Sequence, residues 1–252
     1  MRSNLSDTEK NFREGIISGI PIALGYLAVS FAFGIQAVKA GLSVFQATLI
    51  SLSNVTSAGQ FAGISVIAAA GSYLEMAGVQ LVINLRYMLM SAALSQKIEP
   101  GLPTYKRLGI AFGVTDEIFG VSITRPGMLA PAFSAGVILI SVSGWVFGTF
   151  LGAFSGEILP ARLISALGVA LYGMFIAIVV PPSREDKNIA IAALLAVAAS
   201  TVFTYAPVLK DISSGTRIII VTVMVSVIAA LLFPAADRPE EKVLKEKGAE
   251  ND

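Results

Sequence analysis

Long apolar runs, separated by short stretches of Gly, Pro and charged residues, extend along the chain from about residue 15 to residue 233. A helix needs about 20 apolar residues to cross a hydrocarbon core of about 30 Å, and most of these runs reach that length. The punctuation divides them into predicted helices at 15–37, 43–70, 73–96, 107–124, 130–154, 162–181, 188–207 and 215–233. The pattern predicts an all-α, polytopic transmembrane helix bundle with seven or eight helices, because the fourth run is short and contains two acids.

The composition indicates a membrane domain rather than a soluble one. Of the 252 residues, 55% are hydrophobic and 14% are charged, whereas soluble domains have about 25% charged residues. We expect a cytoplasmic N-terminal arm over 1–14, one transmembrane domain over 15–233 and a charged cytoplasmic tail over 234–252. The net charge of +1 and the absence of segments that mix aromatic and basic residues exclude a nucleic-acid surface. The lipid bilayer is the expected surrounding.

The chain has neither Cys nor His. These absences exclude disulfides, thiolate metal sites and thiol nucleophiles, and they remove the usual metal ligand and the usual proton carrier near neutral pH. No metal or cofactor is therefore expected. Any proton movement must use carboxyl groups, and Asp116 and Glu117, within the fourth run, are the predicted proton-coupling residues.

The second apolar run carries the polar stretch SNVTSAGQ over residues 53–60. The 28 residues of 43–70 would make a helix of about 42 Å, longer than a membrane crossing requires. We therefore predict that this helix is broken near Gly59. Free N–H groups near Gly59 and Gln60 would attract a carboxylate, and free carbonyl groups near Asn54 would attract a cation, as in broken helices of transporters. Alternatively, these side chains only hold neighbouring helices together.

Arg86 lies in the middle of the third run, where a cation is costly and should face protein or water. The planar guanidinium suits a carboxylate ligand, and a structural ion pair is the alternative. Asp116 and Glu117 are the expected counter-charges. Asn84 is two positions from Arg86, about 200° around a helix, so it should face a different neighbour.

The first run contains Gly19, Pro21, Gly25 and Tyr26. Pro21 removes a backbone hydrogen bond and predicts a kink, with Gly25 as the small residue that follows it. Tyr26 places a hydroxyl on an apolar body and is a candidate substrate ligand. Packing alone is the alternative explanation for the small residues.

An internal repeat is a further hypothesis. Residues 49–61 (LISLSNVTSAGQF) and 163–175 (LISALGVALYGMF) match at six of 13 positions. A parallel or an inverted pair of halves would account for this match.

Four segments together resemble the AzlC family, the large subunit of bacterial branched-chain amino acid exporters. They are FREGIISGIPIALGY (12–26), TSAGQFAG (56–63), INLRYML (83–89) and TDE (115–117). The marker positions of the resemblance are Gly19, Pro21, Gly25, Tyr26, Gly59, Gln60, Asn84, Arg86, Asp116 and Glu117. The sequence departs from the family where Tyr87 replaces a usual histidine, so a mechanism that needs an imidazole there is in doubt.

The resemblance implies a multi-pass protein of the bacterial cytoplasmic membrane that exports leucine, isoleucine, valine and related amino acids such as methionine. It also implies a small AzlD-type membrane subunit as partner. We expect a zwitterionic amino acid to bind at mid-membrane, with Arg86 or the half-helix after Gly59 on its carboxylate. An ion channel is the main alternative. A membrane-embedded hydrolase is disfavoured, because no Ser with a basic partner, metal cluster or phosphate-binding loop is evident.

Overall fold

The computed structural model describes residues 6–158, 176, 179–207, 209 and 212–234, and the regular structure of these residues is helical. The all-α prediction is confirmed for this part of the chain. The chain divides into two compact units. The first comprises Met1–Ile178 and Ile212–Ile219, and the second comprises Val179–Asp211 and Ile220–Asp252.

Five helices of the described residues are long and apolar enough to cross a membrane. They are α1 (Asp7–Lys39), α4 (Tyr73–Ser95), α7 (Pro131–Ile158), α9 (Lys187–Tyr205) and α10 (Ser214–Leu232). The helix α1 begins eight residues before the predicted start at 15, because Ser6 and Glu9 form a reciprocal capping box. The first turn of α10 is tied to α4, where the Glu75 carboxylate accepts hydrogen bonds from the Gly215 and Thr216 backbone N–H groups. Most of the predicted helix 162–181 lies outside the described residues.

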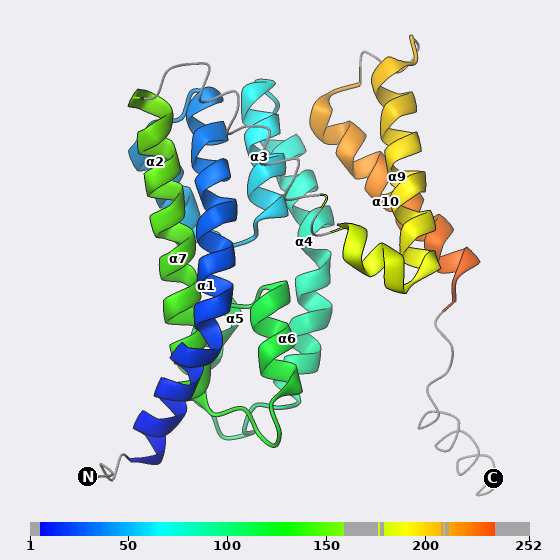
Figure 1. Cartoon of the computed structure of the whole chain (residues 1–252). Helices are drawn as coiled ribbons and strands as arrows, with labels where there is room; N and C mark the ends of the chain where they lie inside the picture. The colour runs from blue at the N-terminus through cyan, green and yellow to red at the C-terminus, as the bar shows by residue number, and fades with distance from the viewer. Residues whose placement is uncertain (1–5, 159–175, 177–178, 208, 210–211, 235–252) are drawn as a thin grey trace, which may run out of the picture. The chain divides into compact units, whose positions relative to one another are not determined.

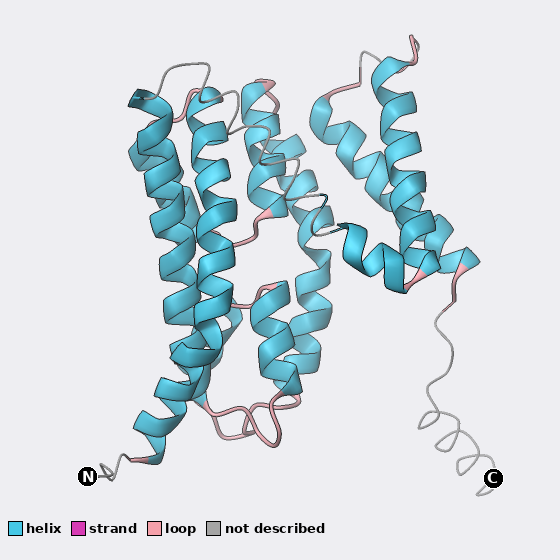
Figure 2. Cartoon of the chain, viewed as in Figure 1, coloured by secondary structure: helices cyan, strands magenta, loops and turns pink. Residues whose placement is uncertain are grey.

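Four shorter helices form two hairpins in the first unit. Hairpin A consists of α2 (Val44–Ser53) and α3 (Ala58–Ala68), and hairpin B consists of α5 (Thr104–Phe112) and α6 (Asp116–Thr124). In Figure 1 each hairpin runs into the unit from one end, turns near mid-height and returns to the same end. Figure 2 shows the two turns as loops in the middle of the helical bundle.

These hairpins confirm one sequence prediction and correct another. The segment 43–70 is broken as predicted, over Asn54–Ser57, and Gly59 lies just inside α3. Its halves turn back instead of crossing. The prediction of one helix over 107–124 is wrong, because Gly113 ends α5 and Thr115 caps α6 with its side chain. Gly disfavours helix continuation, and Thr is a preferred N-cap residue.

The hairpins enter from opposite ends of the first unit. Hairpin A packs on the C-terminal halves of α1 and α7, with Ala47 and Ile64 against Phe33 and Ala153. Hairpin B packs at the other end, where Ile110, Ile118, Leu94 and Phe133 share a cluster. The base of hairpin B is fixed there, because Lys97 donates to Ile123 O at 2.8 Å and Arg125 pairs with Glu14 at 2.9 Å.

Short sequence similarities accompany this opposed arrangement. Gly41-Leu42-Ser43 precedes α2 and Gly101-Leu102-Pro103 precedes α5, while the turns contain Val55-Thr56 and Val114-Thr115. Both valines are buried. The two hairpins therefore share short sequence features before their first helices and in their turns. The repeat predicted between 49–61 and 163–175 has its second copy outside the described residues.

The helices α1 and α7 form a closely packed pair between the hairpins. Small residues line this interface on both sides: Gly15, Gly19, Gly34, Gly136, Gly144, Gly148 and Gly152. A Cβ atom at Gly144 would lie 2.5 Å from the carbonyl oxygen of Ala23, so the two backbones nearly touch. Pro21 lies inside α1, which continues without a break, and Gly25 has open space beside it. The pair forms a rigid support for the hairpin tips.

Candidate functional site

The tip of hairpin A is the uncapped start of a half-helix. Ser57, the residue before α3, makes no side-chain cap hydrogen bond and has φ 49° and ψ −90°. A non-glycine residue in such a conformation is strained, and strain of this kind concentrates at functional sites. The first turn of α3 contains no acid. This tip therefore presents backbone N–H groups whose partial positive charge is not neutralised.

The tip of hairpin B is also the start of a half-helix, but it is capped and acidic. Thr115 Oγ1 accepts a hydrogen bond from Ile118 N at 3.2 Å. Asp116 and Glu117 occupy the first helical turn. Negative charge is favoured at a helix N-terminus by the helix dipole, so this position suits acidic side chains. The two tips thus have opposite electrostatic character.

Arg86 connects α4 to both tips. Its Nη1 lies 2.5 Å from Asp116 Oδ2, and its Nη2 donates to the Tyr87 hydroxyl at 3.3 Å. The Tyr87 hydroxyl in turn lies 3.5 Å from the carbonyl oxygen of Thr56 in the turn of hairpin A. The Nε atom of Arg86 is buried without a hydrogen-bond partner. The pair is not sealed from its surroundings, because the two side chains are 38% and 46% exposed.

Tyr26 on α1 lies between the two tips. Its hydroxyl is 2.6 Å from both Glu117 Oε2 and Thr115 Oγ1. One hydroxyl proton can serve one acceptor at a time, and a carboxylate is the stronger acceptor. The ring packs edge-on against Trp145, with centroids 5.3 Å apart, and against Val55 of hairpin A.

A second polar cluster lies where α3 meets α4. Gln80 Nε2 donates to the carbonyl oxygen of Gly59 at 2.8 Å, and Asn84 Nδ2 donates to Gln80 Oε1 at 3.1 Å. These hydrogen bonds leave Asn84 Oδ1 buried without a partner, and Thr56 Oγ1 is buried without a partner as well. Asn84 and Arg86 do face different helices, as expected from their spacing. Buried polar atoms without partners require an explanation, and a bound ligand or water provides one.

The structure brings together most of the predicted site residues. Tyr26, Arg86, Asp116 and Glu117 share one network, and Asn84 lies beside Gly59 on the other side of α4. Gln60 points elsewhere, since its Nε2 donates to Ser51 Oγ and Ser51 contacts Thr149 of α7. Asn54 is the partly buried C-cap of α2.

Four residues of these networks were missed as site residues in the sequence: Thr56, Gln80, Tyr87 and Thr115. The Val-Thr pair common to both turns is the sequence signal that could have identified Thr56 and Thr115.

Such an arrangement defines a class of protein. Charges and irregular backbone at mid-depth are tolerated only where they face protein or water. Half-helix ends that meet at mid-membrane are typical of transporters. The chain is a multi-pass α-helical membrane protein with a polar centre between two opposed hairpins.

The chain belongs to the AzlC family, because a family model described as AzlC protein matches residues 21–159. This range includes both hairpins and the network from Tyr26 to Glu117. The chain is 34% identical over 172 residues to "Uncharacterized membrane protein" of Archaeoglobus fulgidus, covering 68% of this chain and 75% of the relative. It is 32% identical over 204 residues to "Inner membrane protein YgaZ" of Escherichia coli, covering 77% and 82%.

A more distant relative has a name that states transport. The chain is 23% identical over 180 residues to "Branched-chain amino acid transport protein AzlC" of Bacillus subtilis, and the match covers 70% of each chain. No solved structure matches the chain.

Proposed function

We propose that this protein is a transporter subunit that exports branched-chain amino acids across the bacterial cytoplasmic membrane. Leucine, isoleucine and valine are the proposed main substrates, with methionine as a related one. The name of the Bacillus subtilis relative supports this substrate class. A small AzlD-type membrane subunit is the proposed partner.

The opposite character of the hairpin tips is the observation that carries the proposal. The α3 tip is uncapped and has no acid, whereas the α6 tip carries Asp116 and Glu117 in its first turn. An anion is favoured at the first tip and a cation at the second. A zwitterionic amino acid has one charge of each sign on neighbouring carbon atoms, so it matches this pair of tips.

Arg86 gives the proposed substrate orientation. Its Nε atom is an unpaired donor, so a carboxylate approaching the start of α3 can accept from it without breaking the bond from Nη1 to Asp116. The ammonium group then faces Glu117 at the acidic tip of hairpin B. In this proposal Gly59, Gln60 and Asn54 shape the hairpin A side, and Tyr26 fixes the position of Glu117.

Proton coupling is assigned to Glu117 in preference to Asp116. Asp116 is paired with Arg86, so a change of its charge would leave this cation without its partner. Glu117 accepts a hydrogen bond from the Tyr26 hydroxyl and has no cation within ion-pair distance among the described residues. The titratable groups that interact with it are Tyr26 on α1, Tyr87 on α4 and Asp116 on α6. Glu117 is therefore the proposed coupling residue, because a change of its charge would break no ion pair among the described residues.

The distribution of basic residues favours a cytoplasmic location for the end of the first unit where α1 begins. Six described basic side chains lie at this end: Lys10, Arg13, Lys97, Lys106, Arg107 and Arg125. In the described part of the unit, Lys39 and Arg217 lie at the other end. Basic residues are enriched on the cytoplasmic side of membrane proteins.

The proposal is tested by efflux of labelled leucine from cells that lack their own exporters. Expression of the chain with its small membrane subunit should give saturable efflux that unlabelled isoleucine and valine compete with. Expression of each protein alone tells whether both are needed. Flux that neither saturates nor distinguishes amino acids from inorganic ions would point to a channel instead.

A further inference from the structure

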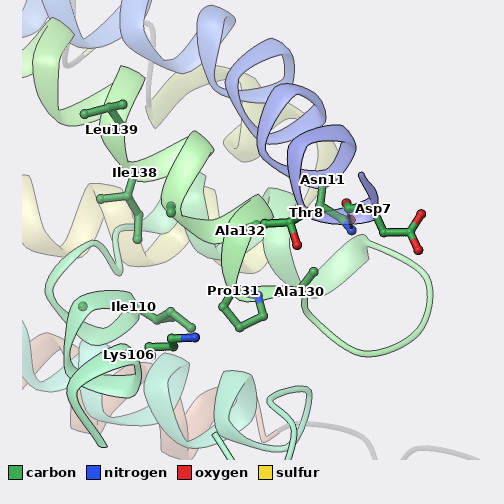
Figure 3. Close-up of a pocket in the computed structure, with 12 residues that line it drawn as sticks. Asp7, Thr8, Asn11, Lys106, Ile110, Ala130, Pro131, Ala132, Ile138 and Leu139 are labelled. Atoms are coloured by element: carbon green, nitrogen blue, oxygen red, sulfur yellow. Dashed lines mark hydrogen bonds between the residues drawn. The ribbon is translucent and has the colours of Figure 1, made fainter. Parts of the chain in front are cut away.

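A groove of about 720 Å³ opens at the end of the first unit where α1 and α7 begin. Figure 3 shows the residues of α1, α5 and α7 that line it, with the Asp7 carboxylate at the outer edge and directed outward. Its polar members are Asp7, Thr8, Asn11 and Lys106, and its apolar wall includes Ile110, Ala135, Ile138 and Leu139. The groove therefore has a polar mouth with one charge of each sign and an apolar interior.

The apolar interior continues along α7. A second groove of about 560 Å³ shares Ile138 and Leu139 with the first and extends past Val146 to Phe150. The 19 steps from Pro131 to Phe150 correspond to about 28 Å of helix, close to the hydrocarbon thickness of about 30 Å. Polar side chains are concentrated at the end that lies at the membrane surface. A charged end followed by a long apolar groove matches a phospholipid, which has a charged headgroup and long acyl chains.

The charges at the mouth are available for a ligand. In the described part of the chain, neither the Asp7 carboxylate nor the Lys106 ammonium takes part in an ion pair, and neither is engaged in a side-chain hydrogen bond. Both side chains are exposed, and they come from different helices, α1 and α5. A lysine ammonium binds a phosphate as a point charge, and a carboxylate accepts hydrogen bonds from a primary ammonium group.

We propose that this groove is a binding site for one phospholipid whose headgroup carries a phosphate and a primary ammonium. Lys106 binds the phosphate, Asp7 binds the ammonium, and an acyl chain lies along α7 over Ile138 and Leu139. A headgroup without a cation is disfavoured, because it would leave the Asp7 carboxylate without an opposite charge. A trimethylated ammonium is disfavoured too, because it has no N–H group to donate.

The proposed lipid would join hairpin B to the α1–α7 pair. Lys106 belongs to α5, the outer helix of hairpin B, and Asp7 belongs to α1. The headgroup would add a second link at the end where Arg125 already binds Glu14 and Asn11. The groove contains no residue of the Arg86 network, so the lipid proposal can be tested independently of the proposed amino acid transport.

Native mass spectrometry of the purified full chain tests the site. The protein is equilibrated with equal amounts of phosphatidylethanolamine, phosphatidylcholine and phosphatidylglycerol of identical acyl chains. The variants are Asp7→Asn and Lys106→Gln, with Glu9→Gln and Lys10→Gln as controls at the same end of α1 that do not line the groove. Ala135→Trp fills the groove at an exposed position, and Leu24→Trp is its control at an exposed position on α1.

The expected result is one tightly retained lipid, with phosphatidylethanolamine enriched about threefold to fivefold over the other two, the effect of one or two exposed charge contacts. Asp7→Asn should remove the preference over phosphatidylcholine, and Lys106→Gln and Ala135→Trp should reduce retention of all three lipids. The controls should behave as the wild-type chain does. Equal retention of the three lipids, or a preference that Asp7→Asn and Lys106→Gln leave unchanged, overturns the proposal. The proposal is also overturned if a second protein chain binds in place of the lipid and no longer binds in Ala135→Trp. The groove would then be the binding site of a partner helix.

Discussion

The hydroxyl of Tyr26 lies 2.6 Å from Glu117 Oε2 and links α1 to the acidic tip of hairpin B. The ring of the same tyrosine packs against Val55 in the turn of hairpin A. One side chain on the rigid α1–α7 pair therefore contacts both tips. The hydrogen bond to Glu117 and the packing contact with hairpin A thus depend on the same residue.

Replacing Tyr26 by Phe should reduce leucine efflux by about tenfold or more, because a hydrogen bond to a charged group contributes about 1.5 to 3 kcal/mol. The amount of protein inserted in the membrane should be unchanged, since the ring still packs on Trp145. Efflux of labelled leucine, normalised to the membrane-inserted protein, measures the effect. Tyr105→Phe, at a position that is 70% exposed, is the control. Full activity of Tyr26→Phe would show that the hydroxyl is dispensable.

Substitution of Arg86 should impair transport more than insertion. Arg86→Lys keeps the charge but loses the planar guanidinium, so we expect it to lose about tenfold or more in efflux, nearly as much as Arg86→Gln. Arg86→Gln alone leaves the Asp116 charge at mid-membrane without its partner. The double variant Arg86→Gln/Asp116→Asn should therefore insert better than Arg86→Gln while remaining inactive. Normal efflux by Arg86→Lys would reduce Arg86 to a structural counter-charge.

Glu117→Gln should separate substrate exchange from proton coupling. The amide retains an acceptor for Tyr26 but cannot change its charge, so an inward proton gradient should no longer accelerate efflux. Exchange of internal for external leucine should remain measurable. The comparison is made in vesicles with and without the gradient, with Asp116→Asn as the neighbouring control. Gradient-driven efflux that persists in Glu117→Gln and disappears in Asp116→Asn would assign the coupling to Asp116.

Two glycine substitutions test the tip of hairpin A. A Cβ atom at Gly59 would lie 2.6 Å from Thr56 Oγ1 and 2.9 Å from Gln80 Oε1, so Gly59→Ala must displace these side chains and disturb the hydrogen bond from Gln80 to the Gly59 carbonyl oxygen. Gly25→Ala is the matched control, because nothing lies within 4 Å of its Cβ position and Ala favours the helix by about 1 kcal/mol. We expect Gly59→Ala to lower efflux strongly and Gly25→Ala to leave it intact. Thermal unfolding of both variants in detergent shows whether a loss of folding explains the result.

Much of the fold follows from the sequence alone. The run lengths around Tyr26 and Arg86 are enough to predict membrane-spanning helices, because each helix must satisfy its own backbone in lipid. The polar stretch 53–60 predicts the break in the second run, since a run of 28 residues is too long for one crossing and contains a cluster of polar side chains. Arg86 and the acids Asp116 and Glu117 could be selected because charges within apolar runs are costly.

Only the tertiary structure decided how these elements meet. Hydropathy gives the length of an apolar run but not whether the chain crosses or turns back, so the hairpins at 44–68 and 104–124 could not be distinguished from crossings. The choice of Asp116 for Arg86 and Glu117 for Tyr26 depends on how α6 is rotated against α1 and α4, which local periodicity does not determine. The sequence determined which residues carry charge within the membrane. Packing between helices distant in the chain decided which charges meet, because pairing energy depends on distances that only the folded bundle sets.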